Sequence, residues 1–149
     1  MTYADWVPPA DELPLIYVAG PYTAPTPEGI SENVRRAQLW GSAINATGLA
    51  WAVVPHNFSQ GMQASLSEQQ WLAFTLASSR RFDGVLLMPG FIKSTGSMGE
   101  MCQAEYDGRP WVASLSLANV EVSVRELVHA ISNKRALVSS ALKAAGAGI

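Results

Sequence analysis

Residues 89–100, with the sequence PGFIKSTGSMGE, combine three glycines, three hydroxyl side chains and one carboxylate in a dozen positions. Gly96 allows the backbone to approach a ligand closely, and Ser94 and Ser97 lie where a helix is expected to begin. The amino end of a helix offers free amide groups and a partial positive charge, so the segment predicts an anion site, such as a phosphate site. It is neither a Walker loop nor a dinucleotide fingerprint, because the glycine and lysine spacings differ. A serine-capped helix after a flexible loop is the alternative interpretation.

The single carboxylate of this segment, Glu100, has two interpretations. The pattern Ser97-x-x-Glu100 is that of a capping box, in which the acid only closes the first turn of a helix. Alternatively, the carboxylate points into a crevice as a nucleophile or base, and Met98 and Met101 remove part of its water.

Two further residues could take part in chemistry. Tyr17 lies inside an apolar run, where it is either core or a hydroxyl at the floor of a crevice. His56 follows the apolar run AVVP, so a ligand contact and a structural role are both open. Asp83, in contrast, opens an apolar run at the end away from the expected site, and we interpret it as structural.

Four apolar segments are expected to form the strands that position these residues. They span residues 15–20, 49–55, 83–90 and 108–117, and helices are expected at about 28–48, 67–80, 97–106 and 123–144. Ser31 or Glu28 is the expected cap of the first helix. Strands that are continuously apolar and alternate with helices predict a small doubly wound, flavodoxin- or Rossmann-like α/β domain. Its parallel sheet would have four to five strands, with helices on both faces.

In such folds the ligand lies at the carboxyl ends of the strands. This rule selects four segments: residues 20–22, 55–57, 89–100 and 114–116. Tyr22, Phe91 and Trp51 are the aromatic residues near these ends that could stack on a planar ligand, although core packing is the expected place of Trp51.

The composition sets the remaining limits. The 149 residues suit one domain, with an irregular leader at 1–14 and a frayed tail at 145–149. A net charge of −2 and scattered basic residues argue against a nucleic acid polymer as partner. The lone Cys102 indicates a reducing compartment, and the absence of a long apolar run or signal peptide favours a cytoplasmic location without a membrane. No metal or cofactor is expected.

The order of five segments resembles the nucleoside 2-deoxyribosyltransferase superfamily, and in particular a branch often carried by phages. The segments are IYVAGPYT, ENVRRAQ, AVVPH, FDGVLLMPG and STGSMGE, followed by GRP, and the resemblance spans about residues 15–116. Members of the superfamily, including 2'-deoxynucleoside 5'-phosphate N-hydrolases, cleave an N-glycosidic bond with a glutamate.

The resemblance implies roles for particular residues. Glu100 matches the catalytic glutamate, Tyr17 the tyrosine of the first strand and Gly20 its glycine. Ser94 matches a serine that binds the 5'-phosphate. A second phosphate serine of the family, which reaches the site of a neighbouring subunit, falls nearest to Ser123.

One departure from the family concerns the acid that protonates the leaving base. The family carries an aspartate on the helix before the third strand, but the segment WLAFTLASSRR has no acid, and Glu68 and Asp83 are the nearest ones. His56 or a group on the substrate would have to replace it.

We therefore expect a nucleotide N-glycosidase that acts on a nucleoside 5'-monophosphate and forms a homodimer or higher homo-oligomer. Base exchange between nucleosides and a non-catalytic nucleotide-binding module are the alternatives.

Overall fold

The computed structural model describes residues 12–58, 62 and 65–146. Most of the expected leader (1–11), the end of the expected tail (147–149) and parts of the loop after His56 lie outside the described residues. The last helix ends at Ala144, close to the expected start of the tail.

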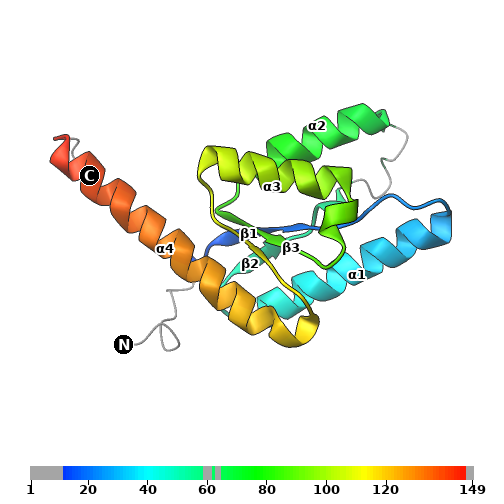
Figure 1. Ribbon diagram of the computed structural model, residues 1–149, viewed down its shortest axis with the longest axis horizontal. Helices are drawn as coiled ribbons and strands as arrows, with labels where there is room; N and C mark the ends of the chain where they lie inside the picture. Colours follow the sequence, from blue (N-terminus) through cyan, green and yellow to red (C-terminus); the bar gives the residue numbers. More distant parts are fainter. Residues whose placement is uncertain (1–11, 59–61, 63–64, 147–149) are drawn as a thin grey trace.

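The centre of the molecule is a sheet of four parallel strands (Figure 1). They are β1 (Leu15–Ala19), β2 (Trp51–Val53), β3 (Gly84–Leu87) and β4 (Trp111–Ala113), arranged in the order β2-β1-β3-β4. This is the order with which flavodoxin-like doubly wound sheets begin, and the chain changes direction across the sheet between β1 and β3. The predicted fold class is thereby confirmed.

Four long helices cover the sheet on both faces (Figure 1). They are α1 (Pro27–Ala46), α2 (Glu68–Ser79), α3 (Thr95–Asp107) and α4 (Val120–Ala144), and the short 3₁₀ turns η3 (Pro55–Asn57), η5 (Phe91–Lys93) and η6 (Leu117–Asn119) lie in the connections. The helices α1 and α4 share one face, and α3 lies on the other. α2 packs mainly against α3.

The alternation of side chains along β1 divides the core into two parts. Ile16 and Val18 pack with α1 and α4, whereas Tyr17 and Ala19 pack with α3. All four are buried, because successive residues of a strand point to opposite faces and both faces are covered by helices. This register directs the hydroxyl of Tyr17 toward the face that carries α3.

Two helices begin earlier than the sequence predicted. α1 is capped by Thr26, whose hydroxyl accepts from the Gly29 amide, rather than by Ser31 or Glu28. α3 is capped by Ser94, whose hydroxyl accepts from the Ser97 amide at 3.2 Å. In both cases a hydroxyl residue further upstream adopts extended backbone and satisfies an amide that would otherwise lack a partner.

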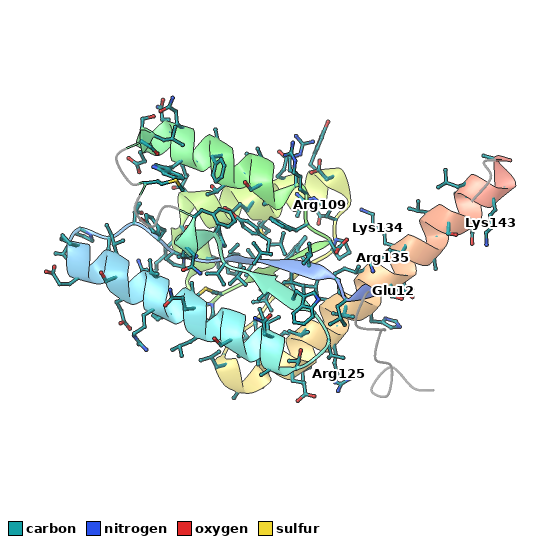
Figure 2. The ribbon with its side chains drawn as sticks, turned by 180° about the vertical axis from the view of Figure 1, so that it is seen from behind. Glu12, Arg109, Arg125, Lys134, Arg135 and Lys143 are labelled. Atoms are coloured by element: carbon teal, nitrogen blue, oxygen red, sulfur yellow. The ribbon has the colours of Figure 1, made fainter. Side chains whose placement is uncertain are left out.

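The amino ends of β1 and β3 are held together by one ion pair and two hydrogen bonds, away from the expected site. Asp83 accepts from the Leu15 amide at 2.8 Å and pairs with Arg135 of α4 at 3.1 Å. Arg135 also donates to the Glu12 carbonyl at 3.1 Å, and Figure 2 shows both residues where α4 passes β1. The structural role predicted for Asp83 fits this position.

Trp51 is neither core nor ligand platform. It opens the edge strand β2, is 49% exposed and does not line the cavity at the carboxyl ends of the strands. Both expectations for this residue are therefore wrong.

Candidate active site

A cavity of about 500 Å³ opens at the carboxyl end of the sheet. Its walls come from the residues after β1 and β2, from α2 and from the amino end of α3. Of the residues predicted for the site, the cavity brings together Tyr17, Gly20, Tyr22, His56, Ser94, Gly96, Ser97 and Glu100. Segments far apart in the sequence thus meet where the strands of a doubly wound sheet end.

Glu100 and Tyr17 form a buried pair in this cavity. The Tyr17 hydroxyl lies 3.1 Å from Glu100 Oε1 and 3.3 Å from the Thr75 carbonyl. Glu100 is 6% exposed, and the side chain of Tyr17 is fully buried. α3 begins at Thr95, so Ser97 already lies inside the helix and Glu100 lies in its second turn. Ser97 is therefore not a cap and cannot form a capping box with Glu100. The capping interpretation is therefore wrong, and the carboxylate faces Tyr17 instead.

Burial governs the protonation of this pair. It raises the pKa of Glu100 to about 8, against a usual value near 4.5, and the hydrogen bond from Tyr17 opposes part of the rise. Burial, followed by the neighbouring Glu100 charge, also holds the pKa of Tyr17 far above its ordinary value. Tyr17 is therefore a permanent donor, and Glu100 is mostly protonated at neutral pH in the free protein.

The pair has two arrangements of its protons. When Glu100 is ionised, Tyr17 donates its only hydrogen to the carboxylate. When Glu100 is protonated, the carboxyl group can donate to the Tyr17 oxygen, and the Tyr17 hydrogen turns to the Thr75 carbonyl. Either way each buried polar atom keeps a partner, so the pair can gain or lose one proton without leaving an unsatisfied group.

The amino end of α3 forms one wall of the cavity, and its free amides could accept an anion. Ser94 Oγ accepts from the Ser97 amide, so its own hydrogen stays available for a ligand. The amides of Thr95 and Gly96 precede the first intrahelical bonds, and Lys93 adds a cation beside them. Gly96 keeps this wall close to α2, because a Cβ there would lie 3.3 Å from Leu72 Cδ2.

Ser97 lies in the same wall of the cavity. It is 2% exposed, and its hydroxyl has no hydrogen-bond partner in the part of the chain that the structure describes. An unsatisfied buried hydroxyl costs free energy, which a hydrogen bond to a bound anion would recover. The sequence singled out this residue, but only the structure shows that its hydroxyl is unused.

His56 and Tyr22 line the opposite side of the cavity. His56 Nε2 lies 3.0 Å from the Pro21 carbonyl, which only accepts hydrogen bonds, so this nitrogen carries the hydrogen. Nδ1 has no partner among the described residues, and burial lowers the pKa of the ring. His56 is consequently neutral. The ring of Tyr22 meets it edge to face, with 6.0 Å between centroids.

The structure adds residues that sequence reasoning did not assign to the site. Lys93, Trp71, Leu72 and Thr75 line the cavity. Glu68 lines it too, although the sequence had indicated it only as one of the acids nearest to the position of the family's aspartate. The interior face of α2 could not be predicted, because this helix carries apolar residues on all sides. Lys93 directly precedes Ser94, and this position next to a predicted site residue could have indicated that it lies in the cavity.

Two predicted residues lie elsewhere. Phe91 packs against the core part that contains Tyr17 and does not line the cavity. Ser123, at 8% exposure, donates to Ser114 Oγ at 2.9 Å, also outside the cavity of its own chain. Its hydroxyl is already used by the fold, because α4 begins at Val120 and presents Ser123 to the end of β4.

A scan of the sequence against protein-family models finds no match, and a search of curated proteins finds none either. None of the described helices has the length and apolar character needed to cross a membrane. Within the same residues, no group of three or more His, Cys, Asp and Glu side chains is placed to hold a metal ion.

Proposed function

We propose that this protein cleaves the N-glycosidic bond of a nucleoside 5'-monophosphate, with Glu100 as the nucleophile. The observation that carries the proposal is the buried Tyr17–Glu100 pair in a cavity whose neighbouring wall is the amino end of α3. The resemblance of the sequence to nucleoside 2-deoxyribosyltransferases points to the same chemistry.

The proposed reaction follows from the arrangement of the residues around the cavity. Ser94, Ser97 and Lys93, with the first amides of α3, hold the phosphate. The sugar then lies over Glu100, whose carboxylate attacks C1' as the base departs, and water releases the sugar from the resulting ester. Tyr17 orients the carboxylate through its hydrogen bond.

Base exchange is the nearest alternative, with a second base in place of water. A wall built for a phosphate favours hydrolysis, since transferases of free nucleosides have no phosphate to hold. The proposed ligand is a small nucleotide of the cytoplasm, and no nucleic acid polymer or membrane is involved.

A panel of ribo- and deoxyribonucleoside monophosphates, followed by chromatography of the released base, tests the proposal. We expect base release by the natural protein and none by Glu100→Gln, which keeps the shape of the side chain but removes the nucleophile. Glu126→Gln, the same change at an exposed glutamate of α4 outside the cavity, is a control that should retain activity. Full activity in Glu100→Gln would exclude Glu100 as the nucleophile.

A non-catalytic nucleotide-binding module is the second candidate. It is favoured by the raised pKa of Glu100, because a protonated carboxyl group is no nucleophile. This candidate predicts that nucleotides raise the melting temperature while no base appears at any pH up to and above 8.

We also propose that the protein is a homodimer or larger homo-oligomer. Phe74 of α2 is 45% exposed, and Leu137 on the last turns of α4 is 72% exposed. These turns extend beyond the body of the molecule (Figure 1). A few helical turns that pack against nothing else are only marginally stable in water. Sedimentation analysis should show a dimer or larger species, and Leu137→Ser should weaken the association. A monomer at all concentrations would contradict this proposal.

A further inference from the structure

The cavity holds few groups that could protonate a leaving base. Besides the Tyr17–Glu100 pair, the titratable side chains that line it are Tyr22, His56, Glu68 and Lys93. The loop segments 59–61 and 63–64, with sequences SQG and QA, contain no acid, histidine or lysine. The helix α2 presents Thr75 to the catalytic pair, and the Thr75 hydroxyl donates to its own helix at the Leu72 carbonyl.

None of these groups is suited to deliver a proton at the glycosidic bond. The ring of Tyr22 packs edge to face against His56. His56 is neutral, and its single N–H donates to the Pro21 carbonyl. Glu68 is exposed in the first turn of α2, seven residues and about 10 Å along the helix from Thr75, whose carbonyl meets the catalytic pair. Lys93 belongs to the phosphate wall. A general acid typically accelerates such a step about 10²- to 10⁴-fold, so a neutral base would leave slowly from this cavity.

A base that carries a positive charge in its N-glycoside needs no acid, since it departs as a neutral molecule. We propose that the substrates of this site are nucleoside 5'-monophosphates with a cationic base, such as a pyridinium or an N7-alkylated purine. The proposal rests on the proposed function and names its substrate class.

The distribution of charge in the cavity agrees with a ligand of this kind. Lys93 and the amino end of α3 suit the phosphate, while the carboxylates of Glu68 and Glu100 line the same cavity and suit a cation. Glu68 has no hydrogen bond or ion pair with the other described residues. The aromatic rings of Tyr22 and Trp71 add faces that attract a planar cation. A bound cation would also favour the ionised form of Glu100.

The steps balance without an outside acid. The Glu100 carboxylate forms a bond to C1', and the electron pair of the C1'–N bond moves to the ring nitrogen, which cancels its positive charge. Water then attacks C1' of the glycosyl ester, the carboxylate is released, and one proton goes to solvent. The products are the neutral base, the sugar phosphate and a proton.

The first test compares 7-methylguanosine 5'-monophosphate with guanosine 5'-monophosphate, which differ by one methyl group and one charge. Nicotinamide mononucleotide serves as an independent cationic probe. We expect kcat/KM to be at least about a hundredfold higher for the methylated nucleotide, the lower bound of what an absent acid costs. Equal kcat/KM values for the two guanosine nucleotides would overturn the inference and leave the proposed function standing. Release of base from none of the three, and from none of the deoxyribonucleoside monophosphates of the panel, would overturn both.

Variants of α2 provide a second readout. Thr75→Asp places an acid beside the catalytic pair and should raise the cleavage of guanosine 5'-monophosphate at least about tenfold, whereas the isosteric Thr75→Asn should not. Glu68→Gln should raise KM for nicotinamide mononucleotide more than for guanosine 5'-monophosphate. Glu28→Gln, at a matched first-turn position of α1 outside the cavity, should affect neither. An equal rise of KM for both nucleotides in Glu68→Gln would contradict the role given to its charge.

Discussion

At the scale of single residues, the proposed reaction depends on the protonation of Glu100, whose carboxyl group meets the Tyr17 hydroxyl. The hydroxyl donates to an ionised carboxylate at 3.1 Å and lowers its pKa, while burial raises it to about 8. The activity of a carboxylate nucleophile should therefore increase with pH and level off above about 8. A residue that combines reactivity with deep burial needs such a donor, because an isolated buried charge is costly.

Replacement of Tyr17 by Phe removes this donor. We expect activity to fall and the midpoint of its pH profile to move above that of the natural protein, since Glu100 loses the hydrogen bond that opposes the rise of its pKa. A stability loss of about 1 kcal/mol should accompany the change. The matched control is Tyr106→Phe, because Tyr106 is 87% exposed. An unchanged midpoint in Tyr17→Phe would show that the hydrogen bond does not set the protonation of Glu100.

Ser97 offers a test in which binding and stability change in opposite directions. Its buried hydroxyl lacks a partner among the described residues, so Ser97→Ala should leave the melting temperature equal or higher. The same change should raise KM for a nucleotide several-fold. The buried Ser79, whose hydroxyl donates to the Leu76 carbonyl at 2.8 Å, is the control, and Ser79→Ala should lower stability and leave KM alone. A destabilised Ser97→Ala would mean that the hydroxyl has a structural partner.

At the scale of elements, the amino end of α3 performs two tasks with one side chain. Ser94 caps the helix as an acceptor, and its own hydrogen remains available for the phosphate of the proposed substrate. Aspartate is an equally good cap, so Ser94→Asp should preserve or slightly raise stability, yet its charge should repel a phosphate. We expect a large rise in KM for nucleotides with an unchanged melting temperature. Unimpaired nucleotide binding in this variant would place the phosphate elsewhere.

The elements also show how far the sequence determines the site. Strand ends were predictable because the runs around Tyr17 and Asp83 are continuously apolar, and parallel strands bring their carboxyl ends together. The caps Thr26 and Ser94 were missed, since the choice between neighbouring hydroxyl residues depends on which one meets a free amide. The contribution of α2 to the cavity could not be predicted from the sequence. Its apolar residues point to all sides of the helix, so no periodicity marks an inner face; they are Trp71, Leu72, Phe74 and Leu76.

At the scale of the whole molecule, the chemistry of the site is linked to folding. A carboxyl group whose pKa is about 8 in the folded protein and near 4.5 when unfolded holds its proton more tightly in the folded state. Its contribution to stability is complete below about 4.5 and is lost as the pH rises through 8. His56 acts in the opposite direction, because its lowered pKa makes the folded state lose stability as the pH falls below about 6.5.

The difference between two proteins separates these opposing effects. Glu100→Gln cannot ionise but keeps His56, so the unfolding free energy of the natural protein minus that of the variant should fall between pH 4.5 and 8. The slope should approach about 1.4 kcal/mol per pH unit at most. Urea unfolding at a series of pH values measures it. A flat difference would mean that Glu100 is ionised in the folded protein at neutral pH, and the nucleophile would then be ready without a ligand. A falling difference would instead mean that Glu100 holds its proton in most molecules of the free protein at neutral pH, so that a ligand favouring the ionised form would free the nucleophile.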